Sequence, residues 1–304
     1  MIYDLTIIGS GPAGLNASVY ASRYGLKNII IGSVAGGLTS QTHEIGNWLG
    51  NQKITGFEFA QKSVEHAKSF GTEIKNNLVD EIIKDDDFFS LLLSSGEKIR
   101  SKTVLVAMGT KHRNLGVPGE KELAGKGISY CATCDGFFFK KKIVAIVGGS
   151  DSAAGAAVYM ADIADKIYII YRRDKLRAEK FWVDSIEKSD KIEILYSTNI
   201  KEIKGTEKVE EIVLDNNFNG SSKLKVDGIF VEIGADPSTN LVKNIGVDLD
   251  AEGYIKIEND GKTSVKGIWA AGDITNGSNK FKQIVTAAAE GAIAAESIQK
   301  FLKK

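Results

Sequence analysis

The chain has 304 residues, no formal net charge at pH 7, and a composition of 43% hydrophobic and 26% charged residues. This length can build two domains with buried cores, and the composition is typical of a globular protein. The neutral balance argues against a nucleic-acid-binding or membrane-surface protein, and no apolar run approaches a membrane span. Because a strand is expected from Ile2, no secretory leader is predicted, and we expect a cytosolic protein.

The N-terminal residues predict a β–α–β unit. Ile2–Ile8 forms a buried strand, a helix runs from about Pro12 to Tyr24, and Asn28–Ile31 forms the next strand. Between strand and helix lies a G-x-G-x-x-G turn, Gly9-Ser10-Gly11-Pro12-Ala13-Gly14, in the setting of a dinucleotide-binding fold. Such a turn lets the main chain and the helix N-terminus approach a pyrophosphate. The acid that often holds a ribose after the second strand is absent, since Gly32-Ser33 stands there.

The residues that follow predict a helix, a β-meander and a linker. Gly56–Phe70 has helical periodicity, and Val79–Val106 alternates as a meander does. Arg113–Gly119 carries glycines and a proline and is expected to be the linker into an inserted domain.

A second β–α–β unit follows the linker. Lys142–Val147 is expected as a strand, Gly148–Ala153 as a turn, and Lys166–Tyr171 as the next strand after a helix that ends near Ala164. The fold is therefore partly repeated. Ser150 takes the place of the second glycine of the turn, so one alternative is a turn that only packs a helix onto a sheet.

Three arginines after this second unit favour a nucleotide site. Arg172 and Arg173 directly follow the strand, and Arg177 lies about one helical turn on. Guanidinium groups at this place suit a 2′-phosphate, whereas an acid would suit NAD. We therefore expect NADP rather than NAD, with a solvated charge run as the alternative.

The C-terminal part predicts a return to the first domain. A helix is expected at Arg177–Glu187, several strands between Ile192 and Ile233, a crossing at Gly234–Asn240, a strand at Gly267–Ala271 and a closing helix at Lys282–Leu302. The prediction is an α/β protein with two Rossmann-like three-layer domains. One domain is discontinuous, residues 1–113 and 241–304, and residues 114–240 form the inserted domain. The two linkers are plausible hinges for a domain rotation.

The only two cysteines of the chain are Cys131 and Cys134, within Cys131-Ala132-Thr133-Cys134-Asp135-Gly136. Two thiols at this spacing can form a disulfide that exchanges with another disulfide, and Asp135 supplies a neighbouring acid. A zinc site would need two more ligands, and His43, His66 and His112 lack metal-ligand spacing. A redox-active pair is preferred over half a zinc site or inert thiols, and no metal is predicted.

With these motifs placed, the chain resembles the low-molecular-weight thioredoxin reductases over nearly its whole length. The motifs that carry the resemblance are Gly9–Gly14, Gly36-Gly37, Asn47-Trp48, Ala107-Met108-Gly109, Cys131–Gly136, Arg172–Ala178, Ile233–Thr239 and Ala270–Asp273. The resemblance implies an FAD domain with an inserted NADPH domain, a homodimer, and a thioredoxin-like disulfide protein as partner.

The resemblance also implies roles for individual residues. Cys134 would face the flavin, Cys131 would attack the protein substrate, and Asp135 would be the acid/base. The expected FAD contacts are Gly9, Ser10, Gly11, Pro12, Ala13, Gly14, Gly37, Asn47, Val79, Ala107, Gly109, Gly272, Asp273, Lys282, Gln283 and Ile284. The expected NADPH contacts are Gly149, Ser150, Asp151, Ser152, Arg172, Arg173, Arg177, Ile233 and Gly234.

The chain departs from the family pattern at several positions. Leu38, Met108, Ser150, Gly155-Ala156 and Tyr171 replace the usual residues, and the loop Thr275–Phe281 is longer than typical. The expected reaction carries electrons from NADPH through FAD and the Cys131–Cys134 disulfide to a thioredoxin-like protein. The alternatives are a reductase driven by ferredoxin or another donor, which Ser150 favours, acting on a glutaredoxin- or peroxiredoxin-type partner, or a non-catalytic flavin redox sensor.

Overall fold

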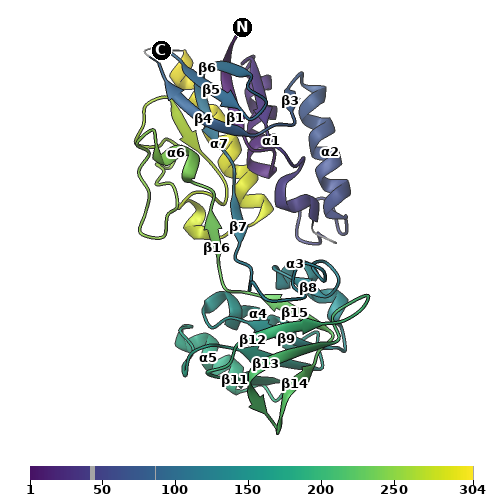
Figure 1. Ribbon diagram of the computed structural model, residues 1–304. Coiled ribbons are helices and arrows are strands. Elements are labelled where there is room, and N and C mark those ends of the chain that lie inside the picture. Colours follow the sequence, from purple (N-terminus) through teal and green to yellow (C-terminus); the bar gives the residue numbers. More distant parts are fainter. Residues whose placement is uncertain (42–44, 86, 304) are drawn as a thin grey trace. The chain divides into compact units, whose positions relative to one another are not determined.

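The computed structural model describes residues 1–41, 45–85 and 87–303 (Figure 1). His43, one of the three histidines considered above as metal ligands, lies outside these residues, as does Asp86. The chain divides into two compact units, one of residues 1–111 and 236–304 and one of residues 112–235. It passes between them along β7 (Thr110–His112) and β16 (Ala235–Pro237), which pair with each other in a two-stranded sheet.

The first unit is built on a seven-stranded sheet of order β3-β2-β1-β6-β5-β4, in which β17 also pairs with β6. Its strands are β1 (Ile2–Ile8), β2 (Asn28–Ile31), β3 (Glu73–Lys75), β4 (Val79–Lys84), β5 (Phe89–Leu93), β6 (Lys98–Val106) and β17 (Ile268–Ala270). β2, β1, β6 and β17 run parallel, and β4, β5 and β6 form the antiparallel meander. The helices are α1 (Pro12–Arg23), α2 (Gly56–Ser69), α6 (Asn240–Lys243) and α7 (Ile284–Leu302), with 3₁₀ turns η1 (Gly37–Gln41) and η3 (Ser278–Lys280).

The core of this unit lies between the parallel strands and the helices α1 and α7, which pack against each other (Figure 1). Small residues allow the two helices to approach closely, since a Cβ added to Gly291 would lie 2.1 Å from the carbonyl oxygen of Ala13. Trp269 is almost fully buried here, and its indole N–H donates to Ser297 at 3.0 Å. The close approach fixes α7 beside the first glycine turn.

The second unit contains a five-stranded sheet of order β11-β10-β9-β15-β8 and a three-stranded sheet β12-β13-β14. Its strands are β8 (Ile128–Ser129), β9 (Ile143–Val147), β10 (Lys166–Ile170), β11 (Ile192–Leu195), β12 (Ile200–Lys204), β13 (Glu211–Phe218), β14 (Ser221–Lys225) and β15 (Gly228–Val231). The helices are α3 (Ala132–Asp135), α4 (Asp151–Ala161) and α5 (Lys180–Glu187), with the 3₁₀ turn η2 (Gly136–Phe139). The five-stranded sheet is parallel, and one core packs α4 and α5 on it while another lies between the two sheets.

Helix α5 begins three residues later than the sequence predicts, at Lys180 instead of Arg177. The N–H of Arg177 donates to the carbonyl of Gly149 at 2.7 Å, and the N–H of Glu179 donates to Asp151 at 2.7 Å. These bonds hold the segment after β10 against the second glycine turn, and Glu179 has a non-helical ψ of 150°, so the helix begins at Lys180.

Within residues 1–41, 45–85 and 87–303, no helix is both long and apolar enough to cross a membrane. The same residues contain no group of three or more His, Cys, Asp or Glu side chains arranged to hold a metal ion.

Candidate functional site

The first glycine turn connects β1 to α1 and leaves an open approach to its main chain. Gly9 has φ of +112°, and a Cβ there would lie 2.3 Å from the carbonyl oxygen of Ala107, so only glycine fits. A Cβ added to Gly11 would meet nothing within 4 Å. No side chain caps α1 at Gly11, and Pro12 occupies its first turn. The free N–H groups behind this opening suit a phosphate.

The loop after β2 encloses the turn and explains the missing ribose-binding acid. The Ser10 hydroxyl donates to the carbonyl of Val34 at 2.6 Å, and the N–H of Gly36 donates to the carbonyl of Ser10 at 2.9 Å. A Cβ at Gly32 would lie 2.6 Å from the Ser10 hydroxyl oxygen. The strand end therefore has no room for a carboxylate at Gly32. Gly37 approaches the same turn, since a Cβ added to it would lie 3.0 Å from the Cα of Gly11.

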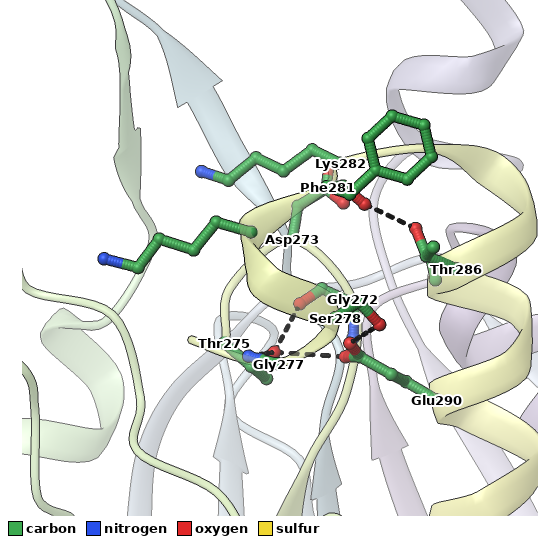
Figure 2. A pocket seen from close by; sticks show the side chains of 11 residues that line it. Gly272, Asp273, Thr275, Gly277, Ser278, Phe281, Lys282, Thr286 and Glu290 are labelled. Carbon is green, nitrogen blue, oxygen red and sulfur yellow. Dashed lines mark hydrogen bonds between the residues drawn. The ribbon is translucent and has the colours of Figure 1, made fainter.

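A small pocket in the same unit lies between the segment 272–282 and the start of α7 (Figure 2). Asp273 lines it, and burial raises the pKa of this carboxyl to about 6, with a smaller upward contribution from the Glu290 carboxylate; the Lys282 ammonium opposes both. Lys282 also donates to the hydroxyl of Tyr254 and lies 3.8 Å from the centre of its ring. The pocket thus pairs a buried acid with a positioned cation, a combination that suits a polar ligand.

Glu290 of α7 organises this pocket, and it is not among the residues predicted from the sequence. Its carboxylate accepts from the N–H of Gly272 at 2.8 Å, the hydroxyl of Thr275 at 3.0 Å and the hydroxyl of Ser278 at 2.6 Å (Figure 2). The lone acid in the alanine-rich first half of the expected closing helix was the available signal. Glu290 thereby holds the long loop that the sequence marks as unusual.

We expect Glu290→Ala to destabilise the first unit by about 1–3 kcal/mol, because three donors lose a charged acceptor. The measurement is thermal unfolding followed by circular dichroism, where the Tm should fall by several degrees. Glu296→Ala is the matched control, since Glu296 forms an i,i+4 ion pair with the exposed Lys300 on the same helix. Equal Tm values for the two variants would contradict the assigned role.

Asn47 and Gln283, both expected near a flavin, are brought together although they are far apart in sequence. The Asn47 amide donates to the side-chain oxygen of Gln283 at 3.0 Å. Gln283 precedes α7, and its N–H donates to the Thr286 hydroxyl at 3.2 Å, which forms half of a capping box. Ile284 is the first residue of this helix.

The remaining expected FAD contacts sit at strand ends of the same sheet. Ala107 is buried directly after β6. Gly109 follows with φ of +63°. Val79 begins β4 and packs against two hydrophobic clusters. The roles of these residues in FAD binding stay predictions.

Cys131 and Cys134 form a disulfide at the start of α3 in the second unit. The hydroxyl of Ser129 donates to Oδ2 of Asp135 at 2.6 Å, and the N–H of Cys131 donates to the Ser129 hydroxyl at 3.1 Å. Oδ1 of Asp135 is buried and accepts no hydrogen bond from the described residues. Ser129 was not predicted, and it links the acid directly to the cysteine loop.

The second glycine turn, between β9 and α4, is partly filled by a side chain. Buried Tyr171 packs so closely that a Cβ on Gly149 would lie 2.4 Å from its ring. Its hydroxyl is buried with no hydrogen bond among the described residues. Ser150 caps α4 without a side-chain hydrogen bond, and Ser152 is exposed in the first turn of that helix.

Arg172, Arg173 and Arg177 are exposed beside this turn, and no ion pair holds any of them within residues 1–41, 45–85 and 87–303. The main-chain bond from Arg177 to Gly149 keeps the third arginine next to the glycines. Ile233 and Gly234 lie just after β15, where Gly234 has φ of +99°. Three unpaired guanidinium groups beside a glycine turn can bind a phosphate.

The chain combines two Rossmann-type units with a disulfide between cysteines that are separated by two residues. This combination defines a nucleotide-dependent disulfide oxidoreductase. A family model described as pyridine nucleotide-disulphide oxidoreductase matches residues 3–291, and the chain belongs to this family, among its thioredoxin reductases. Its activity is that of an oxidoreductase.

Relatives over the full length support this assignment. The chain is 40% identical to a thioredoxin reductase of Bacillus subtilis (strain 168), over 100% of the chain and 96% of that protein. It is 41% identical to a thioredoxin reductase of Peptoclostridium acidaminophilum, over 99% of the chain and 98% of that protein. The crystal structure of thioredoxin reductase from Streptococcus pyogenes MGAS5005 matches with a TM-score of 0.87 and 37% identity, over 99% of this chain and 98% of that one. These matches confirm the family and the fold class that the sequence predicts.

Proposed function

We propose that the chain uses NADPH and FAD to reduce the disulfide of a thioredoxin. The observation that carries this proposal is the Cys131–Cys134 disulfide, which lies in one unit with the arginine-lined glycine turn and has Asp135 beside it. The names of the relatives support thioredoxin as the partner.

The residues of the first unit fit FAD. Gly11 leaves open space at the N-terminus of α1 for a pyrophosphate. Asp273 and Lys282 provide an acid and a cation that can bind the polar part of FAD between its ring systems. Asn47 and Gln283 form an amide pair that can contact a ring edge. When bound, FAD accepts a hydride and delivers two electrons to a disulfide.

The cysteine loop carries the exchange chemistry. Both cysteines are partly exposed and can exchange with a partner disulfide. As the family resemblance implies, we assign the attack on the partner disulfide to Cys131 and the resolution of the mixed disulfide to Cys134. Asp135 holds and moves a proton next to the thiols, and the hydrogen bond from Ser129 orients its carboxylate.

The second unit fits NADPH. Arg172, Arg173 and Arg177 can bind the 2′-phosphate, while Gly149, Ser150 and Asp151 surround the pyrophosphate position at the start of α4. An exchangeable cysteine pair with no further cysteines in the chain suits the reducing cytosol, and we propose a cytosolic homodimer, as the family resemblance implies.

The test is an anaerobic titration of the purified yellow protein with NADPH and, in parallel, with NADH. The readout is the flavin absorbance at about 450 nm. We expect near-stoichiometric bleaching by NADPH and recovery of the colour on addition of oxidised thioredoxin. A protein that binds no flavin, or one bleached by NADPH that thioredoxin does not reoxidise, would contradict the proposal.

A different electron donor is the second candidate, and Tyr171 favours it together with Ser150. The Tyr171 ring occupies space beside Gly149, and the Ser150 side chain replaces a glycine hydrogen where a pyrophosphate comes closest. No bleaching with either nucleotide, combined with electron transfer from dithionite-reduced protein to thioredoxin, would select this candidate. The donor would then be a ferredoxin-like carrier.

A further inference from the structure

Glu120 is a buried acid directly after the linker that enters the second unit. The residue is only 3% exposed, and its carboxylate accepts from the N–H of Leu115 at 2.8 Å and from the N–H of Gly116 at 2.7 Å. The N–H of Ile203 in β12 donates to the carbonyl of Pro118 at 2.9 Å, which ties the same turn to the three-stranded sheet. The Glu120 carboxylate therefore closes the linker into a loop at a fixed place.

The same carboxylate binds Tyr130, the residue before Cys131. The Tyr130 hydroxyl donates to Glu120 at 3.0 Å and has the side-chain oxygen of Asn114 as a second acceptor at 3.2 Å. Burial raises the pKa of Tyr130 to about 12, and the charge and hydrogen bond of Glu120 add to this rise. The hydroxyl therefore keeps its proton and remains the donor. We name these connected residues the linker clamp: Leu115, Gly116, Glu120 and Tyr130.

The cysteine pair lies between two anchored residues. Tyr130 precedes Cys131 and is held by the linker clamp. Asp135 follows Cys134 and accepts at 2.6 Å from the hydroxyl of Ser129, which ends β8. The N–H of Cys131 donates to the same hydroxyl at 3.1 Å. Neither anchor uses a sulfur atom, so both can persist when the sulfur–sulfur bond opens.

We propose that Glu120 and Tyr130 are positioning residues that favour closure of the Cys131–Cys134 disulfide. Reduction breaks the sulfur–sulfur bond, and two electrons and two protons convert the pair to two thiols. The hydrogen bond of Tyr130 limits the freedom that the opened loop gains, so the thiols keep a high effective concentration toward each other. A more stable disulfide makes the dithiol a stronger reductant toward a partner disulfide. This role rests on the dithiol chemistry of the proposed function.

The coupling also acts in the opposite direction. If the linker clamp stabilises the closed disulfide, opening the disulfide weakens the linker clamp by the same factor. The N–H groups of Leu115 and Gly116 donate to the carboxylate of the clamp, so reduction loosens the linker at these two residues. The redox state of the cysteines is thus transmitted to the linker within one unit.

The first test is the equilibrium of the full-length protein with dithiothreitol, in which protein disulfide and dithiothreitol give protein dithiol and oxidised dithiothreitol. The dithiol fraction is measured by iodoacetamide alkylation and mass spectrometry, and the chain has no other cysteines. Tyr130→Phe keeps the ring that stacks on His112, with centroids 5.2 Å apart, and removes only the hydroxyl. We expect the equilibrium constant for reduction to rise about three- to tenfold, which corresponds to the net contribution of one hydrogen bond.

Glu120→Gln is the second variant, because it removes the charge of the acceptor without shortening the side chain. It should shift the equilibrium in the same direction, and adding Tyr130→Phe should shift it no further, since both changes remove the same bond. Tyr168→Phe is the matched control, because Tyr168 is a partly buried tyrosine of the same unit that packs against Phe218. Wild-type equilibrium constants in both Tyr130→Phe and Glu120→Gln, or an equal shift in Tyr168→Phe, would overturn the proposal.

The second test is hydrogen–deuterium exchange of the peptide that contains Leu115 and Gly116, before and after reduction by dithiothreitol. In the wild type, we expect reduction to speed this exchange about three- to tenfold. In Tyr130→Phe the two amides still donate to Glu120 but no longer respond to the cysteines, so the redox difference should disappear. Equal exchange in both redox states of the wild type would mean a structural role alone and would overturn the proposal. Both tests use dithiothreitol as the reductant, so a failure of the proposed NADPH, FAD or thioredoxin chemistry would leave their outcome unchanged.

Discussion

Replacing Cys134 by serine is expected to lower the rate of thioredoxin reduction by about 10³-fold or more, because a hydroxyl can neither form the Cys131–Cys134 disulfide nor resolve a mixed one. The measurement is NADPH consumption in the presence of thioredoxin. The same variant should still pass electrons from NADPH to ferricyanide, since that acceptor takes electrons without the cysteines.

The neighbouring Thr133→Ala variant is the control for loop damage. Its hydroxyl lies 3.5 Å from Cys131 Sγ but takes no part in the exchange, so its rate should change by less than about tenfold. A Cys134→Ser protein that reduces thioredoxin at the wild-type rate would overturn the dithiol mechanism and leave the fold assignment unaffected.

The double variant Arg172→Gln, Arg173→Gln is expected to raise the KM for NADPH by about 10²-fold, because two charge-assisted contacts to the 2′-phosphate are lost. The KM for NADH should hardly change, since NADH lacks that phosphate. Both arginines are exposed, so the free energy of unfolding should stay within about 0.5 kcal/mol of the wild type.

The control for this experiment is Arg100→Gln in the first unit, where the guanidinium lies 3.6 Å from the centre of the Phe88 ring. It should leave both KM values unchanged. An equal rise in KM for NADPH and NADH in the double variant would mean that the two arginines do not bind the 2′-phosphate.

Local motifs made much of the fold and of the candidate site predictable. Each β–α–β unit can be predicted from a buried strand followed by a glycine turn. The turn needs glycines because the main chain approaches a ligand or another strand there. The cysteine pair is equally local, since its two sulfurs are separated by only two residues. The strands and helices at these motifs lie within a few residues of their expected bounds.

Residues that act through long-range contacts could not be predicted. Glu290 meets Gly272 and Thr275 only because α7 packs back onto the first glycine turn. Glu290 stands in no motif, and the sequence offers no sign of its partners.

The tertiary structure also explained departures from pattern that the sequence could only report. The missing acid after β2 follows from the contact of Gly32 with Ser10, and the late start of α5 follows from the non-helical ψ of 150° at Glu179, in a segment bonded to Gly149 and Asp151. By itself, the sequence determined the family, the two nucleotide-type units and the redox pair, because these depend on residues close together in the chain. Only the folded structure decided that Glu290 holds the loop at the pocket and that Asn47 meets Gln283, because those contacts join segments far apart in the sequence.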